Sequence, residues 1–569
     1  MRVEMTTEKD VGAAKESGQI VVSSKTLGLI STGIYRSPAS ALKELVSNAF
    51  DADAQWVEVS MNPPRFDAVS VTDNGAGIMP EKFLELMRGQ IGDSDKRAHG
   101  DRTAVKGRPL IGRIGIGLLA IAQICHGFEV VSHHKKSRQA FRALVQISDD
   151  MRDNIDEIEL DGTNGTTPKL DIGTYEVFDI EFDERRCGTS IIATDLKYGF
   201  LRRILRSTPA TRVEGNDALD GVGEARGVSV ESTITSTESA ATPETPPPLP
   251  PTFEGFFDAA VRHNSLREIS EYWRTTWGIA LAAPIPYLNG GPVRGQPVNQ
   301  ERQEALKSYD FNVLVDGLSL RRPILLPPRV RDQRLTRDVH VETLHIDSVI
   351  DGVRLQGQGY IYSQGGKSIY PAELRGMLIR IKGVAIGDYD RNFLDYPYVE
   401  GPRYSWLSGE FDIEEGLEDA LNIDRDSFNQ AHPHYLEVQA LIHGAMDRHV
   451  RPWLYRNLDI RRKDRAQATA VARQEALNET VAHILPNAHI ERINKPLPQT
   501  QEQESFVTPV RIDEHNDSIE VNEVASAWPR SHRNRELAQE IAIGFEFALL
   551  ASTPNEMRRR FYEYLKRVL

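Results

Sequence analysis

The sequence has 569 residues, 40% hydrophobic and 26% charged, a composition typical of soluble globular protein with roughly two to four domains. A net charge of −14 disfavours nucleic acid as a partner without excluding it. Two cysteines, an N-terminus without an apolar core, and no apolar run of about 18 residues predict a cytoplasmic protein that does not span a membrane.

The pattern along the chain predicts an α+β protein. Residues 1 to about 20 are polar, and we expect no regular structure there. The region 20–206 alternates between strand-like and helix-like segments, which favours an α/β sandwich as the first domain. We expect strands at about 57–61, 69–72, 128–132, 141–147, 175–182 and 190–195, and helices at 38–50, 80–88 and 116–125.

A segment rich in Ser, Thr, Pro and Gly separates this domain from the next. Its composition predicts a disordered linker or long loop over 207–252, and its prolines 246–251 suit either a spacer or a polyproline ligand. A second α+β domain is expected over 253–432, with a helix at 255–277 and strands at about 311–316, 342–346, 357–363 and 376–382. The region 433–569 reads as mixed and mainly helical, suited to dimerisation or client binding.

The predicted helix 38–50 carries the first candidate site. Glu44, Asn48 and Asp51 are spaced i, i+4 and i+7, which places them on one helical face. Such a row can supply a base, a metal ligand and a further polar contact. A surface helix with a polar stripe has the same pattern.

Three further motifs follow in order. In the stretch 71–78 a strand delivers Asp73 into a turn with Gly75 and Gly77, where a carboxylate can accept the amino hydrogens of adenine. Asn-Gly is also a common turn. Glycines 112, 115 and 117 precede an apolar helix, whose start can bind phosphate, without forming a Rossmann or P-loop motif. Gly188 and Thr189 then open a strand.

Taken together and in this order, the four motifs resemble the GHKL, or Bergerat-fold, ATPases, which include gyrase, heat-shock protein 90, histidine kinases, MutL and MORC proteins. The resemblance covers about 20–200 and implies binding of ATP and Mg²⁺. It implies that Glu44 is the general base, that Asn48 coordinates Mg²⁺, and that Asp51 lies near the nucleotide.

The same resemblance implies an adenine contact by Asp73, with Gly75 and Gly77 beside the base and Thr189 supporting it through water. The phosphate contacts are the backbone N–H groups of Gly112, Gly115 and Gly117. The polar segment 79–110 suits a lid, in which Ser94 and Lys96 contact the nucleotide or the closed state.

The second domain is similar to the middle segment of heat-shock protein 90 over 373–428, through Gly409, Asp412, Leu421, Asn422 and Arg425. This similarity implies that Arg425 reaches the γ-phosphate from the second domain, a suitable role for a guanidinium in phosphoryl transfer.

Gyrase and MutL use a lysine of the second domain for that contact, and Lys367 and Lys382 are the candidates here. We therefore expect a Mg²⁺-dependent ATPase acting as a homodimeric, chaperone-type clamp with a protein client. The alternatives are a MORC- or MutL-like nucleic-acid clamp, an ATP-driven switch in bacterial stress or anti-phage defence, and a scaffold that does not hydrolyse ATP.

Overall fold

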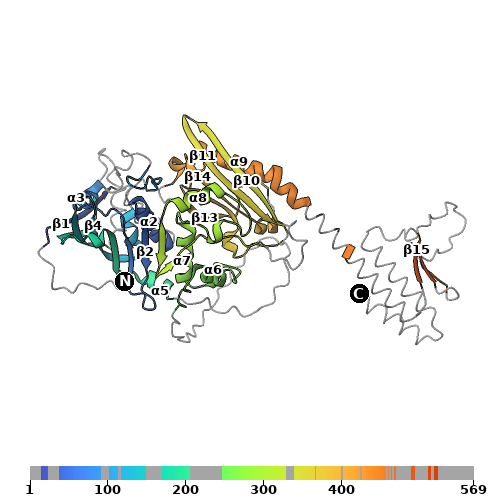
Figure 1. Cartoon of the computed structure of the whole chain (residues 1–569), viewed down its shortest axis with the longest axis horizontal. Coiled ribbons are helices and arrows are strands. Elements are labelled where there is room, and N and C mark those ends of the chain that lie inside the picture. Colours follow the sequence, from blue (N-terminus) through green and yellow to red (C-terminus); the bar gives the residue numbers. More distant parts are fainter. Residues whose placement is uncertain are drawn as a thin grey trace, which may run out of the picture. The chain divides into compact units, whose positions relative to one another are not determined.

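The computed structural model describes most of the chain up to residue 456 and short pieces beyond it. The described residues are 14–23, 38–90, 102–112, 117–148, 169–205, 246–327, 339–365, 367–398, 401–422, 426–456, 459, 463, 467–468, 489–493, 510–513 and 518–522. They fall into two compact units, Met1–Leu454 and Tyr455–Leu569. Figure 1 shows the elements of both units.

The first sheet has nine strands in the order β1-β6-β5-β4-β7-β3-β2-β8-β9. Its neighbours pair antiparallel except β2 and β8, which are parallel. The strands are β1 (Glu16–Ser23), β2 (Trp56–Ser60), β3 (Val69–Asp73), β4 (Cys125–His134), β5 (Gln139–Ile147), β6 (Lys169–Asp179), β7 (Gly188–Leu196), β8 (Asn312–Val315) and β9 (Leu318–Ser319). The expectation that 16–20 lacks regular structure was wrong, because β1 pairs with β6 at the sheet edge.

Helices and shorter turns cover this sheet, as the α+β prediction requires. They are α2 (Pro38–Asp51), α3 (Pro80–Glu85), the π-helical η2 (Leu86–Gln90), the 3₁₀ turns η4 (Gly117–Gln123) and η6 (Glu184–Arg186), and α5 (Tyr198–Ile204). The helix expected at 116–125 is therefore a shorter 3₁₀ turn, because β4 already begins at Cys125 and pairs there with Leu196 of β7.

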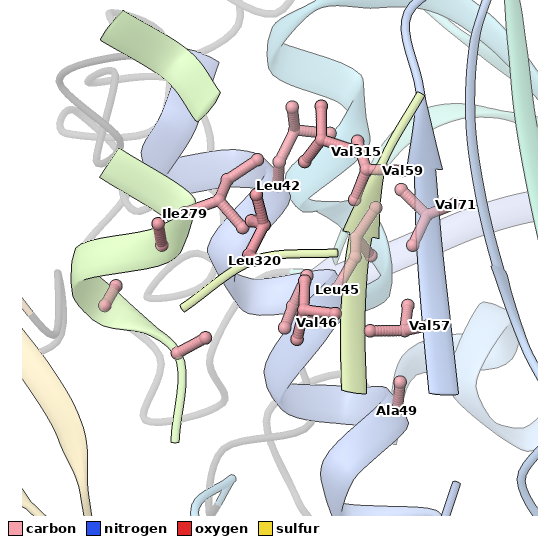
Figure 2. Packing of buried hydrophobic residues seen from close by; sticks show 14 of the residues in the cluster. Leu42, Leu45, Val46, Ala49, Val57, Val59, Val71, Ile279, Val315 and Leu320 are labelled. Carbon is pink, nitrogen blue, oxygen red and sulfur yellow. The ribbon is translucent and has the colours of Figure 1, made fainter. Parts of the chain in front are cut away.

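Helix α2 lies in the middle of the main hydrophobic cluster (Figure 2). Its buried Leu42 and Leu45 share this cluster with Val57 of β2 and Val315 of β8. Side chains at i, i+3 and i+7 form one apolar stripe, so the helix must bury that face. The opposite face, which carries Glu44, Asn48 and Asp51, is only half-buried.

The chain after the proline-rich segment packs onto the first sheet. It forms α6 (Phe253–Ala260), η7 (Leu266–Glu268), α7 (Glu271–Ala282), η8 (Leu288–Gly290) and α8 (Gln300–Ser308) before it enters β8. Here the structure differs from the division expected at residue 252, because β8 and β9 complete the first sheet. The helix expected over 255–277 is split, since Ser265 and Ser270 each cap a new helical turn.

The described part of the proline run packs against this helical segment. Pro246 is buried, Leu249 contacts the main cluster, and the indole N–H of Trp273 donates to the carbonyl oxygen of Pro247 at 2.9 Å. A spacer or a polyproline ligand was expected for these prolines, and the described residues instead pack within the chain.

The second sheet has five strands in the order β10-β11-β14-β12-β13, with β12 and β14 parallel. These strands are β10 (Val339–Ile350), β11 (Val353–Gln364), β12 (Gly376–Ile381), β13 (Val384–Asp390) and β14 (Leu407–Glu415). The turns η10 (Ala372–Leu374), η11 (Gly401–Trp406) and η12 (Glu418–Ala420), helix α9 (Pro433–Ala445) and the π-helical η13 (Met446–Val450) accompany them. Its own hydrophobic cluster includes Val438 and Ile442 of α9.

The second unit contains a three-stranded sheet, β15-β17-β16, formed by β15 (His489–Ile493), β17 (Ser518–Asn522) and β16 (Val510–Asp513). Of the region 433–569, which was expected to be mixed and mainly helical, the structure describes α9, η13 and this small sheet, while 537–549 and most of 462–484 lie outside the described residues. Among the helices that the structure describes, none is long and apolar enough to cross a bilayer.

Candidate functional site

The polar face of α2 points toward the glycine-rich segment, and Asp51 makes the contact. One oxygen of its carboxylate accepts the backbone N–H of Ile111 at 2.8 Å, and the other accepts that of Gly112 at 2.7 Å. Charge-assisted hydrogen bonds of this kind are the strong ones in proteins. Asp51 therefore fixes the beginning of the glycine-rich loop to the helix that carries Glu44 and Asn48.

The turn after β3 is attached to the end of the same helix. The N–H of Ala76 donates to the carbonyl oxygen of Ala52 at 2.8 Å, and a Cβ on Gly75 would lie 2.7 Å from that oxygen. The side chain of Asn74 accepts the backbone N–H groups of Gln55 and Trp56. Gly75 is thus required by the close approach of two chain segments rather than by a ligand alone.

Asp73 ends β3 inside this arrangement. Its carboxylate accepts the N–H of Gly75 at 2.7 Å and the backbone N–H of Thr189. Burial raises the pKa of the Asp73 carboxyl to about 6, although both N–H donors favour the ionised form. A carboxylate has about four lone-pair positions, so acceptor capacity remains for a ligand such as the adenine amino group.

Gly77 and Gly188 allow the neighbouring strands to approach the Asp73 turn. Gly77 has a φ of +77°, and a Cβ there would overlap the carbonyl oxygen of His133. Gly188 has a φ of +125°, and a Cβ there would overlap the carbonyl oxygen of Asp73 itself. Both positions therefore require glycine, because a side chain there would keep the neighbouring segments from packing against the Asp73 turn.

Ser132 is a member of the site that sequence reasoning missed. Its hydroxyl accepts the N–H of Ile78 at 2.8 Å, donates to the carbonyl oxygen of Gly188 and lies 3.1 Å from the hydroxyl of Thr189. Ser132 therefore joins the Asp73 turn to the start of β7. A lone serine inside a strand gives no local signal of such a role.

Part of the lid segment is described, and Arg108 anchors it. This buried guanidinium donates to the carbonyl oxygens of Phe50, Tyr309 and Asp310, and it lies over the Phe50 ring at 4.8 Å. The carboxylate of Asp53 accepts two further backbone N–H groups of the lid segment. The C-terminal end of α2 therefore holds both the lid base and the glycine-rich loop.

Lys382 of the second sheet reaches the glycine-rich loop. Its ammonium donates to the carbonyl oxygen of Leu110 at 3.2 Å, one residue before the Asp51 contacts begin, and pairs with Glu418 at 3.0 Å. The lysine is almost fully buried. Lys367 lies just after β11, where its backbone N–H donates to the carbonyl oxygen of Gln364 at 3.3 Å and its carbonyl oxygen accepts from the Gln364 side chain at 3.2 Å.

The remaining predicted residues divide into two groups. Ser94, Lys96, Gly115 and Arg425 lie outside the described residues, and Gly117 is described only as the first residue of η4. From the passage similar to heat-shock protein 90, Gly409 and Asp412 lie in β14. There the carboxylate of Asp412 is engaged by Arg302 at 2.6 Å in a buried ion pair.

The residues present fit the nucleotide and metal that the motifs imply. The buried Asp73 carboxylate suits an amino donor, and the amide of Asn48 supplies an oxygen on the face beside Glu44. Mg²⁺ is usually bound by one or two protein oxygens together with substrate phosphates, so one amide is a sufficient protein contribution. Lys382 adds a positive charge at the loop expected to hold those phosphates.

Comparisons with known proteins match the region that contains most of these residues. Residues 35–169 match a family model described as histidine kinase-, DNA gyrase B-, and HSP90-like ATPase. The DNA mismatch repair protein MutL of Anaplasma phagocytophilum is 32% identical over 135 residues, which are 24% of this chain and 20% of that protein. HgiDII of Herpetosiphon aurantiacus, named as a candidate type II restriction enzyme, is 37% identical over 118 residues, 20% of this chain and 18% of that one.

A crystal structure of the N-terminal domain of a DNA repair protein covers 76% of this chain and 97% of its own, with 13% identity and a TM-score of 0.34, too low to carry an argument. The chain spans about a fifth of the length of the two curated relatives. The expected likeness to heat-shock protein 90 and the chaperone role are not confirmed by these relatives, which are named for mismatch repair and restriction. The chain contains a GHKL-type ATPase domain.

Proposed function

We propose that the protein is a Mg²⁺-dependent ATPase of MutL-like type, in which Lys382 of the second sheet completes the nucleotide site. The observation that carries this proposal is the contact between the Lys382 ammonium and the carbonyl oxygen of Leu110 at 3.2 Å. A lysine at this place suits the gyrase and MutL arrangement, and it replaces Arg425 as the residue of the second domain that contacts the γ-phosphate.

In this proposal each group has one task. Asp73 accepts the adenine amino hydrogens, Asn48 holds Mg²⁺, and the loop fixed by Asp51 offers N–H groups to the phosphates. Glu44 orients and deprotonates the attacking water. Lys382 stabilises the negative charge on the γ-phosphoryl oxygens, which is the main catalytic need in phosphoryl transfer. Mg²⁺, when held there, would further neutralise the phosphate charge.

An ATPase assay on two variants tests these assignments. Glu44→Gln should bind ATP like the parent and lose turnover, because the amide keeps the shape of the side chain and removes the base. Lys382→Ala should lose turnover as well. Lys367→Ala is the matched control and should hydrolyse ATP at the parental rate. Parental turnover in both the Glu44 and Lys382 variants would refute the proposed site.

The names of the relatives support DNA as the substrate, and we propose that the protein acts on it as a clamp in which two copies of the chain close when ATP binds. The net charge of −14 favours topological retention over electrostatic adhesion. The test measures retention on circular and linearised DNA after a wash in high salt. Retention on circles that requires ATP supports the clamp, and equal loss from both DNA forms refutes it. Crosslinking with and without a non-hydrolysable ATP analogue tests dimerisation.

A further inference from the structure

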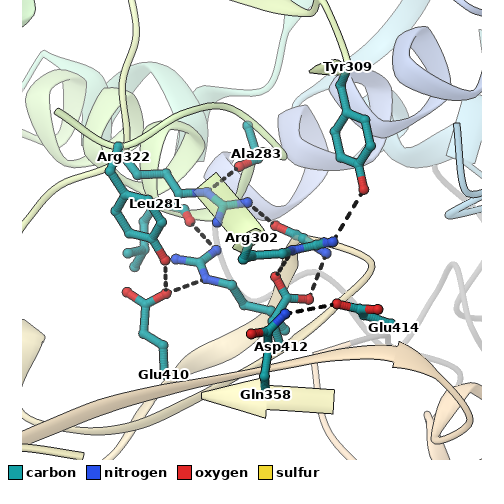
Figure 3. A network of polar contacts seen from close by, with 12 residues as sticks. Leu281, Ala283, Arg302, Tyr309, Arg322, Gln358, Glu410, Asp412 and Glu414 are labelled. Carbon is teal, nitrogen blue, oxygen red and sulfur yellow. Dashed lines mark hydrogen bonds and ion pairs between the residues drawn. The ribbon is translucent and has the colours of Figure 1, made fainter. Parts of the chain in front are cut away.

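We propose, on the basis of the function above, that Arg322 and the Arg302–Asp412 ion pair are positioning residues that hold the Lys382–Gly383 turn against the glycine-rich loop. Figure 3 shows the buried network of arginines and carboxylates to which they belong. These residues lie outside the four motifs, and the buried contacts that carry the proposal join three separate stretches of the chain.

The turn itself has a demanding backbone. Lys382 and Gly383 connect β12 to β13, with φ values of +52° and +89°. Two consecutive residues with positive φ form the tight hairpin turn that best matches strand twist. A lysine in this conformation is strained, and the N–H of Lys382 is held by the carbonyl oxygen of Ile413 at 2.8 Å.

Arg322 holds the carbonyl side of the turn. This fully buried guanidinium donates to the carbonyl oxygens of Gly383 and, at 3.0 Å, Ala283. It also lies over the ring of Tyr287 at 5.0 Å. Arg322 follows β9, the last strand of the first sheet. Its guanidinium therefore links the turn to the sheet that carries the nucleotide site.

Asp412 holds the amide side of the same residue. One of its carboxylate oxygens accepts the N–H of Gly383 at 3.0 Å, and the other pairs with Arg302 of α8 at 2.6 Å. A Cβ on Gly383 would lie 3.0 Å from the Arg302 guanidinium and 3.3 Å from that of Arg322. Gly383 is therefore enclosed by both arginines, with each of its backbone polar groups engaged.

Lys382 is adjacent to Gly383, so the contacts that hold Gly383 also restrict Lys382. Because the clamp reaches the turn from residues 283–322 as well as from β14, the turn cannot move freely against the first sheet. A displacement of about 1 Å in a catalytic group lowers a rate by roughly 100-fold. The buried network thus determines the position of the lysine charge relative to the γ-phosphate. Two buried arginines maintain that position.

Arg322→Lys tests the proposal, because it retains the charge and removes the fork. We expect kcat for ATP hydrolysis to fall roughly tenfold while KM for ATP stays within about twofold. Arg375→Lys is the matched control: Arg375 likewise donates to a backbone carbonyl oxygen, that of Ile369, and lies over an aromatic ring, that of Tyr370. It precedes β12 at the end away from the Lys382–Gly383 turn and should leave kcat near the parental value.

A double-mutant cycle separates positioning from general stability. In a Lys382→Ala background, Arg322→Lys should cause no further loss of kcat, because the group that it positions is gone. Gly383→Ala provides a second route, since it displaces the turn without removing a buried charge, and it should show the same dependence on Lys382.

The possible results separate the positioning role of Arg322 from the catalytic role proposed for Lys382. A slow Lys382→Ala enzyme with parental kcat in Arg322→Lys and Gly383→Ala would overturn the positioning role alone. A further tenfold loss on adding Arg322→Lys to Lys382→Ala would overturn it too. Parental kcat in Lys382→Ala would instead refute the proposed catalytic role of the lysine.

Discussion

The carboxylate of Asp51 lies 2.7 Å from the backbone nitrogen of Gly112 and holds the glycine-rich loop to helix α2. One side chain thereby links the face that carries Glu44 and Asn48 to the loop expected to bind phosphate. We predict that Asp51→Asn weakens ATP binding by roughly 10- to 100-fold, because the amide replaces one acceptor with a donor facing an N–H. Calorimetric titration with ATP measures this loss.

The control for that experiment is Asp179→Asn, which removes an exposed ion pair with Lys15 at the far edge of the sheet. It should bind ATP like the parent. Equal ATP affinity in the Asp51 variant and this control would show that the loop does not depend on the carboxylate.

ATP binding should depend on pH through Asp73. Burial raises the pKa of this carboxyl to about 6, and only the ionised form offers all of its lone pairs to amino hydrogens. Affinity for ATP should therefore be constant above pH 7 and fall as the pH drops through 6. Asp73→Asn should bind weakly at every pH. A parental affinity that stays level from pH 7.5 to pH 5 would contradict this prediction.

Gly188→Ala should disrupt the site by sterics alone. The residue has a φ of +125°, and a Cβ would overlap the carbonyl oxygen of Asp73. Strain and overpacking together predict a loss of roughly 3 kcal/mol in the free energy of unfolding, with loss of ATP binding. Gly199→Ala in α5 meets nothing within 4 Å and should be neutral or slightly stabilising in the same urea titrations.

Arg108 should matter for both stability and the lid. Its guanidinium donates to three backbone carbonyls, and lysine cannot reproduce that fork. We expect Arg108→Lys to lower the free energy of unfolding by roughly 2–3 kcal/mol and to increase proteolysis within the lid segment. Arg102→Lys, an exposed neighbour that donates to the carbonyl oxygen of Gly107, should change neither quantity. Unchanged proteolysis in the Arg108 variant would argue against an anchoring role.

Local patterns were sufficient for the elements around the motifs. The stretch around Leu42 and Leu45 has helical periodicity, and the strand that ends at Asp73 alternates buried and half-buried residues, so both were predictable from neighbours in sequence. The α+β class follows from that alternation. The strand at 16–23 was missed because its residues are largely polar and it depends on pairing with β6.

The contacts that assemble the site depend on residues far apart in sequence. Ser132, Arg108 and Arg322 stand in no recognisable motif, and each acts through backbone groups brought to it by the fold. The parallel pairing of β2 with β8 places residues 312–319 in the first sheet. Composition alone could not predict this long-range pairing.

The helix carrying Glu44 and Asn48, the Asp73 turn and the glycine-rich segment were predictable from residue spacing, because each depends on a few turns of chain. The choice of Lys382 over Lys367 at the Leu110 carbonyl follows instead from the packing of the two sheets. The reason is physical: the position of a charge on a hairpin turn is set by buried partners such as Arg322 and Asp412, and their proximity arises only when the two sheets pack together.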